Sequence, residues 1–192
     1  MNAFIFHGMS WEARFRRAVH LSAPAFLVYY LLPSPLWTGG PPREVALLAV
    51  LAVVMIFELL RLLYDIQVPG MRDYEQERIS AMAWAAIALA IAMLFFPPGL
   101  TAPAVVGMAL IDPLISHLRQ THWYPWVPLA TYFLLVLSIL ILFYSLSPTV
   151  MLTAALASLL AVGVEAIRTR YVDDDFLMII IPLLGMALVM AL

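Results

Sequence analysis

Long apolar stretches, separated by short segments rich in proline, glycine and charged residues, are the feature that most constrains the fold of this chain. A helix needs about 20 apolar residues to cross the hydrocarbon core of a bilayer. Helices satisfy their own backbone hydrogen bonds there, and the sequence lacks the polar and apolar alternation of strands. We therefore expect an all-α protein, a polytopic membrane bundle of helices.

The composition supports this class. Of the 192 residues, 65% are hydrophobic and 11% are charged, whereas a soluble domain is about half apolar and a quarter charged. We expect one transmembrane domain over residues 1–192. The absence of cysteine excludes a disulfide framework and a thiol nucleophile. The first residues lack a basic region and a cleavage site, so we expect no secretory signal.

About seven apolar segments are candidates for transmembrane helices. They cover residues 11–32, 43–64, 79–96, 103–118, 127–146, 149–167 and 176–192. Because proline cannot donate a backbone hydrogen bond, we expect Pro24 to kink the first segment and Asp112-Pro113 to interrupt the fourth.

The charged residues predict the orientation. All arginines except Arg43 lie at the N-terminus or after the second, fourth and sixth segments, and all acidic residues except Glu44 lie towards the same side. The positive-inside rule makes that side cytoplasmic. We therefore expect a cytoplasmic N-terminus and a polar site that faces the cytoplasm.

Three adjacent aspartates, Asp173, Asp174 and Asp175, precede the last apolar segment and follow Glu165. Neighbouring carboxylates repel one another unless a cation lies close by, and oxygen ligands favour Mg²⁺ or a similar hard ion. The alternative is that Asp173 caps the last helix and the other two favour its positive N-terminal end. The sequence leaves both interpretations open.

Asp112 lies about six residues before the inner end of its segment, so a regular helix places it ~9 Å below the membrane surface. A carboxylate at that depth is costly and is a candidate for metal binding or for general-base chemistry. A buried pair with an arginine is the structural alternative.

The remaining candidates are basic residues, acidic residues paired with them, and a histidine. The chain has no lysine, so arginine must bind any phosphate. Glu58 and Arg61 have a spacing that allows an ion pair on one helix face, with a surface network of salt bridges as the alternative. We take Glu58 and His20 as candidates for catalysis with Asp112, and a hydrogen-bonding or interfacial role is the alternative for His20. The candidates for nucleotide binding are Arg61, Arg72, Glu75, Arg78, Arg119 and Arg168.

Several short motifs resemble those of one enzyme family. They are R-R-A-V-H near the start, E-L-L-R at residues 58–61, D-P-L-I at residues 112–115 and E-A-I-R-T-R-Y-V-D-D-D-F-L at residues 165–177. The chain is similar to the polytopic lipid kinases grouped as dolichol kinase, phytol kinase and CTP-dependent diacylglycerol kinase, above all to short archaeal dolichol kinases. These enzymes are related to the phosphatidate cytidylyltransferases. A lysine-rich element of many members is replaced here by R-Q-T-H-W-Y-P-W.

The resemblance implies a CTP-dependent kinase that phosphorylates a polyprenol or related lipid alcohol at the cytoplasmic face of a prokaryotic cell membrane. It implies Mg²⁺ held by Asp112, Glu165 and the three aspartates. The implied partners are a nucleotide, a lipid alcohol and membrane lipids, without nucleic acid. A CDP-lipid-forming cytidylyltransferase and a non-enzymatic transporter or scaffold are alternatives. The sequence does not fix the oligomeric state, and a homo-oligomer is compatible with it.

Overall fold

The computed structural model describes residues 11–68, 71, 75–166 and 172–191. These residues form helices joined by turns and contain no strand, so the expectation of an all-α protein is confirmed. The elements are α1 (Trp11–Leu21), the 3-10 helix η1 (Ala23–Leu31), α2 (Arg43–Leu63), α3 (Ala81–Phe95), α4 (Pro98–Leu118), α5 (Trp126–Phe143), α6 (Pro148–Glu165) and α7 (Asp174–Met190).

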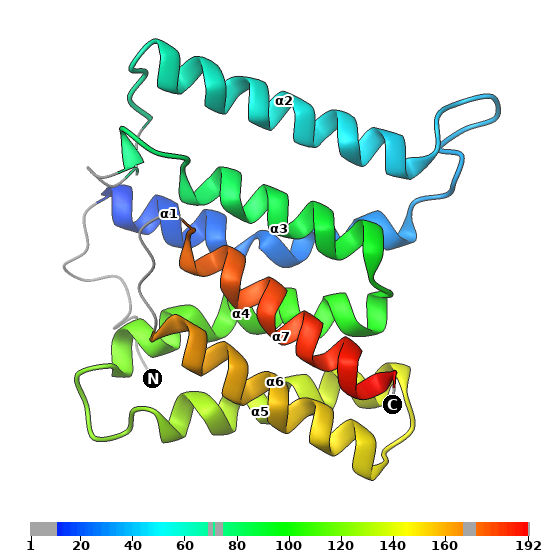
Figure 1. Cartoon of the computed structure of the whole chain (residues 1–192), viewed down its shortest axis with the longest axis vertical. Coiled ribbons are helices and arrows are strands. Elements are labelled where there is room, and N and C mark those ends of the chain that lie inside the picture. Colours follow the sequence, from blue (N-terminus) through cyan, green and yellow to red (C-terminus); the bar gives the residue numbers. More distant parts are fainter. Residues whose placement is uncertain (1–10, 69–70, 72–74, 167–171, 192) are drawn as a thin grey trace.

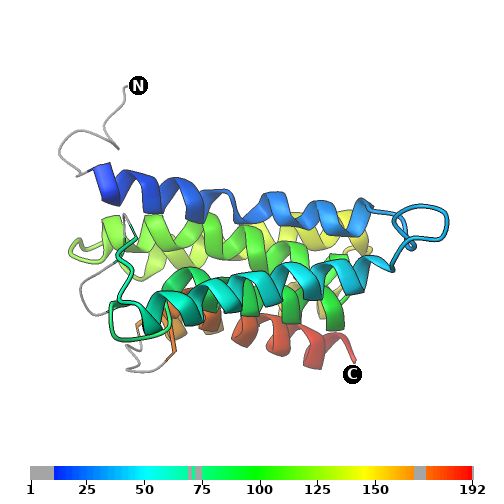
Figure 2. The same ribbon diagram turned by 90° about the horizontal axis from the view of Figure 1, so that it is seen from above.

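The helices run side by side, with their axes close to one direction (Figures 1 and 2). α4 contacts α5, α7 and η1, while α7 also contacts α3 and α6. The core between them consists of small and aliphatic side chains such as Ala104, Ala157 and Ile179, all fully buried. Small residues let helix backbones approach closely where lipid gives no hydrophobic driving force.

Four helices, α2, α4, α5 and α6, are long and apolar enough to cross a membrane, and α3 is a shorter apolar helix. The apolar segments thus form the helices of a membrane protein. The expected number of seven spans and the cytoplasmic N-terminus remain predictions.

The two proline expectations have different outcomes. The α-helix of the first segment ends at Leu21, and a 3-10 helix follows with Pro24 in its first turn. In contrast, the predicted interruption at Asp112-Pro113 is wrong, because α4 is continuous from Pro98 to Leu118 with Pro113 inside it. Neighbouring helices can satisfy the backbone groups that an internal proline frees in a membrane helix.

α4 also begins earlier than predicted, at Pro98 instead of residue 103. Proline is well suited to the first helical position, where its missing N–H has no partner to lose. α3 begins two residues later than expected because Ser80 is its N-cap and its side chain accepts a hydrogen bond from the Ala83 amide. The other helix ends lie within a few residues of the predicted ones, as is usual for helix boundaries.

Candidate functional site

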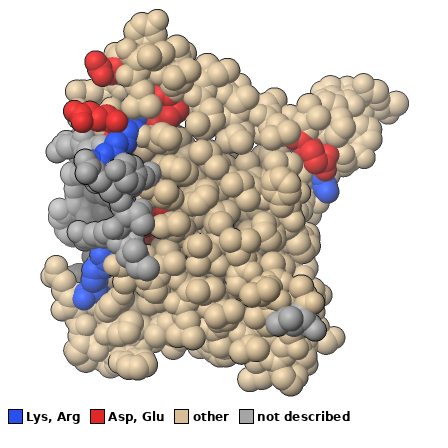
Figure 3. Space-filling view, in the orientation of Figure 1, with Lys and Arg blue, Asp and Glu red and all other residues tan. Residues whose placement is uncertain are grey.

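Charged side chains gather at one end of the bundle. Figure 3 shows acidic and basic atoms at the end where α2 finishes, and one separate group at the opposite end, where α2 begins. That separate group is the Arg43–Glu44 pair, with 3.1 Å between Nε and Oε1. The one-sided distribution of charge expected from the sequence is therefore present in the folded chain.

His20 connects two helices at the charged end. Its Nδ1 lies 3.3 Å from Oδ1 of Asp175, and its Nε2 lies 3.7 Å from Oδ2 of Asp112. The same Nε2 lies 3.3 Å from the carbonyl oxygen of Met108, one turn before Asp112. The side chains of His20, Asp112 and Asp175 are 10%, 22% and 19% exposed, so these polar groups are screened only in part by solvent.

Asp112 also approaches a second pair of carboxylates. Oxygen atoms of Asp112, Glu165 and Asp174 lie within 4.8 Å of one another, although α4, α6 and α7 supply them separately. Arg119, which follows α4, donates to the side chain of Glu165 and to its backbone carbonyl. This ion pair fixes the end of α6 beside the end of α4, and it gives Arg119 a carboxylate partner.

The first turn of α7 holds the three aspartates. Asp173 is the N-cap, and its side chain accepts a hydrogen bond from the Asp175 amide at 3.1 Å, so the predicted capping role is confirmed. Burial, followed by the negative charges of Asp175 and Asp174, raises the pKa of Asp173 to about 8. Capping therefore explains one aspartate, while Asp174 and Asp175 also face groups on other helices.

The donor set fits a hard divalent cation. Three groups of ligand atoms each lie within 4.8 Å: His20 with Asp112 and Asp175, Asp112 with Glu165 and Asp174, and the three consecutive aspartates. Asp112, Asp174 and Asp175 each belong to two of these groups, so neighbouring groups could share one ion. Carboxylate oxygens are the ligands that Mg²⁺ prefers, and the binding of Mg²⁺ or another cation here remains a prediction.

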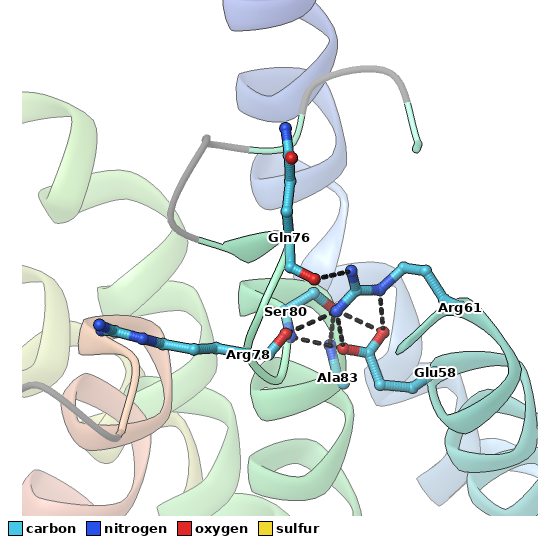
Figure 4. Close-up of polar contacts among 6 residues, drawn as sticks. All are labelled: Glu58, Arg61, Gln76, Arg78, Ser80 and Ala83. Carbon is cyan, nitrogen blue, oxygen red and sulfur yellow. Dashed lines mark hydrogen bonds and ion pairs between the residues drawn. The ribbon is translucent and has the colours of Figure 1, made fainter. Parts of the chain in front are cut away.

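Glu58 and Arg61 form a separate buried hydrogen-bond network with Ser80 (Figure 4). The Arg61 guanidinium donates to Glu58 from Nε at 3.1 Å and from Nη2 at 2.7 Å. The Ser80 amide donates to Oε1 at 2.6 Å, and the Ser80 hydroxyl donates to Oε2 at 3.0 Å. Arg61 also donates to the carbonyls of Gln76 and Arg78. These contacts join the end of α2 to the start of α3.

The remaining candidates for nucleotide binding lie near this network or outside the described residues. The backbone carbonyl of Arg78 accepts a hydrogen bond from Arg61, and the Arg78 side chain extends away from the network (Figure 4). Glu75 is buried, at 4% exposure. Arg72 and Arg168 fall outside the described residues. The phosphate-binding roles of these arginines remain predictions, and the contacts of Arg61 and Arg119 show that both also bind carboxylates.

A cleft of about 430 Å³ connects the two polar groups. Its polar lining includes Asp112, Asp174 and Asp175 near one group and Glu58 and Arg61 near the other, and its remaining walls are mostly apolar. Volumes of this size are typical of small-molecule sites, which combine apolar walls with a few polar groups. The sequence analysis did not foresee this cleft.

Ser80 is the polar residue that sequence reasoning missed. A serine directly before an apolar segment is a recognised N-cap signal, and that signal could have located the start of α3. The second role of Ser80, as a donor to Glu58 across 22 residues, has no local signature. The Met108 carbonyl beside His20 is likewise invisible in the sequence, because it depends on how α1 packs against α4.

Comparisons with known proteins give no assignment: no family model matches the chain, and no curated protein or solved structure matches it.

Proposed function

We propose that the chain is an integral-membrane lipid kinase, which transfers a phosphoryl group from a nucleotide, CTP by resemblance, to the hydroxyl of a polyprenol or related lipid alcohol. The observation that supports it is the convergence of His20, Asp112, Glu165 and Asp174 from four helices at the charged end of an apolar bundle. A mostly apolar cleft reaches His20, Asp112 and Asp174, so a lipid and a water-soluble donor could meet there.

The residues have distinct parts in this reaction. A divalent cation at the carboxylates would neutralise the charge of the donor phosphates, which is the main requirement of phosphoryl transfer. Asp112 is the candidate base. It receives the proton of the lipid hydroxyl while the hydroxyl oxygen forms a bond to the terminal phosphorus of the nucleotide. The bond from that phosphorus to the bridging oxygen breaks, and the nucleoside diphosphate leaves. His20 lies beside Asp112 and can hold its carboxylate in position.

Glu165 and Arg119 support the same site from the side. Glu165 is 5% exposed, and its ion pair with Arg119 places its carboxylate near Asp112 and Asp174. Held carboxylates lose little conformational freedom when they bind a cation, which is the advantage of a preorganised site.

The test uses the purified chain in lipid nanodiscs with a nucleotide labelled at its terminal phosphate, Mg²⁺ and a polyprenol. A lipid phosphate and a nucleoside diphosphate are the expected products. We expect Asp112→Asn to lower the rate by roughly 10²- to 10⁴-fold, which is the usual contribution of a general base. A matched control is Asp65→Asn, because Asp65 follows α2 and does not line the cleft.

Two results would contradict the proposal. One is the absence of lipid phosphate with every nucleotide and lipid alcohol tried. The other is full activity of Asp112→Asn. Release of pyrophosphate with a CDP-lipid product would identify the chain as a cytidylyltransferase instead. Failure to bind any nucleotide in calorimetric titration would favour a transporter or scaffold.

A further inference from the structure

The lining of the cleft is mostly apolar, with a smaller number of polar and charged side chains. Its apolar walls come from three parts of the chain, with Phe26 on η1, Leu51 and Val54 on α2, and Leu89 and Met93 on α3. Asp112 and Asp175 lie in the same cleft. This lining suits an amphiphile, whose polar head would lie beside the carboxylates and whose apolar body would contact the aliphatic side chains.

The position of α2 shows where such a ligand would come from. Only 11% of the most apolar 18-residue stretch of α2 is buried, compared with 61% for α4. The side chains of Val53 and Ile56 are 66% and 57% exposed. α2 is long and apolar enough to span a membrane. In a bilayer these side chains would face lipid, and the cleft behind α2 would lie at the depth of the lipid chains.

Polar contacts attach α2 to the bundle near both of its ends. At one end, Glu58 and Arg61 bind Ser80 and the turn before α3. At the other end, the Arg43 guanidinium lies 3.4 Å from the Tyr30 carbonyl and 3.3 Å from the Leu32 carbonyl. Figure 1 shows α2 at the edge of the bundle, beside α3. α2 can therefore remain in place as a wall without side chains filling the space behind it.

The contents of this space follow from its lining. Water occupies a cavity only where polar groups offer it two or more hydrogen bonds, and most of the lining of the cleft is apolar. Hydrocarbon chains are the apolar molecules present at that depth of a bilayer. They gain no new hydrogen bonds in the cleft and need none.

We propose that the cleft between α2, α3 and η1 binds one hydrocarbon chain of a membrane lipid, that α2 is its bilayer-facing wall, and that the hydroxyl of the lipid reaches Asp112 and His20. The placement of the hydroxyl rests on the proposed function, whereas the binding of the chain does not. Without a bound cation, Asp112, Asp174 and Asp175 repel an anionic head, so in that state the head of this ligand is a neutral hydroxyl or a cation.

The test is photolabelling of the full chain in nanodiscs with a long-chain alcohol that carries a diazirine in the middle of its hydrocarbon chain. Mass spectrometry of peptides then locates the adducts. We expect them on the cleft side of α2 and on α3, at Leu51, Val54 and Leu89, and we expect excess unlabelled alcohol to remove them. Leu51→Trp, which fills the cleft, should lower this labelling by roughly tenfold.

Val53→Trp is the matched control, because Val53 lies two residues away on the same helix and is 66% exposed. It should leave the cleft adducts unchanged. Ala86→Leu fills the cleft from α3 and provides a second variant if Leu51→Trp does not fold. Adducts confined to the outer face of α2, or labelling that neither filling variant reduces, would overturn the inference.

The outcomes separate this inference from the proposed function. Competable adducts in the cleft without any lipid phosphate would support the chain-binding cleft and contradict the kinase. Lipid phosphate formed while the adducts lie elsewhere would support the kinase and contradict the cleft.

Discussion

The buried pair of Glu58 and Arg61 should be a major determinant of how firmly α2 is held. The two residues are 4% and 2% exposed, and each Glu58 oxygen accepts hydrogen bonds from both Arg61 and Ser80. Replacing Arg61 by Met leaves the carboxylate buried without its cation. Breaking a buried ion pair in this way costs about 3–5 kcal/mol, and Glu58→Gln should cost a similar amount because it leaves the guanidinium uncompensated.

The assay is a double-mutant cycle on the purified protein, with unfolding followed by tryptophan fluorescence. Trp84 lies one turn into α3, close to the site of the change. The double variant Glu58→Gln with Arg61→Met should lose much less than the sum of the single losses, because neither charge is then left alone. Arg43→Met is the matched control: it breaks an ion pair at the other end of α2 whose side chains are 28% and 43% exposed, and it should have the smaller effect. Single losses below about 1 kcal/mol, the range of surface pairs, would refute the reasoning.

Three further predictions concern the candidate site and the core. First, cation affinity measured by calorimetry should rise between pH 6 and pH 8. The raised pKa of Asp173, about 8, means that the folded state holds a proton that the unfolded chain releases near 3.8. The contribution of this proton to stability is therefore fully present below pH 3.8 and is lost as pH rises from 3.8 to about 8, and a bound cation would take the place of the proton. Asp173→Asn should flatten this dependence, and an affinity independent of pH would contradict it. Second, Arg119→Met should weaken cation binding, while Arg119→Lys should restore part of it, because the ion pair with Glu165 fixes one ligand; equal affinities in both variants would argue against that role. Third, Tyr132→Phe should be neutral or stabilising in thermal unfolding, because the buried Tyr132 hydroxyl has no hydrogen-bond partner among the described residues; a loss above about 1 kcal/mol would show that it has one.

The helical class and the helix positions could be predicted because they depend on local composition. Apolar runs and proline positions located the helices to within a few residues, with two exceptions: α4 begins at Pro98, and the first segment divides into α1 and η1. The continuity of α4 through Pro113 could not be predicted, because it depends on the helices packed around that turn. The 3-10 geometry after Ser22 could not be predicted either, because Pro24 is compatible with more than one backbone conformation.

The candidate site was predictable in part. Asp112, Glu165 and Asp174 each stood out as carboxylates in or beside apolar segments, and the structure brings their oxygens within 4.8 Å. Their meeting depends on the packing of α4, α6 and α7, which no single segment encodes. The partners of Glu58 show the same limit: the spacing predicted Arg61, three residues away, but not Ser80, which lies 22 residues away.

The uncharged turns at the far end of the bundle have a consequence for biogenesis. Residues 96–97 join α3 to α4, and residues 144–147 join α5 to α6, without a charged side chain in either connection. Two antiparallel helices with such a neutral connection can enter a bilayer together as a hairpin, because no charged side chain has to cross the hydrocarbon layer. In the orientation predicted from the arginines, the arginine-rich ends would stay on the side of synthesis, and the distribution of charge that surrounds the candidate site would also direct the insertion of the nascent chain.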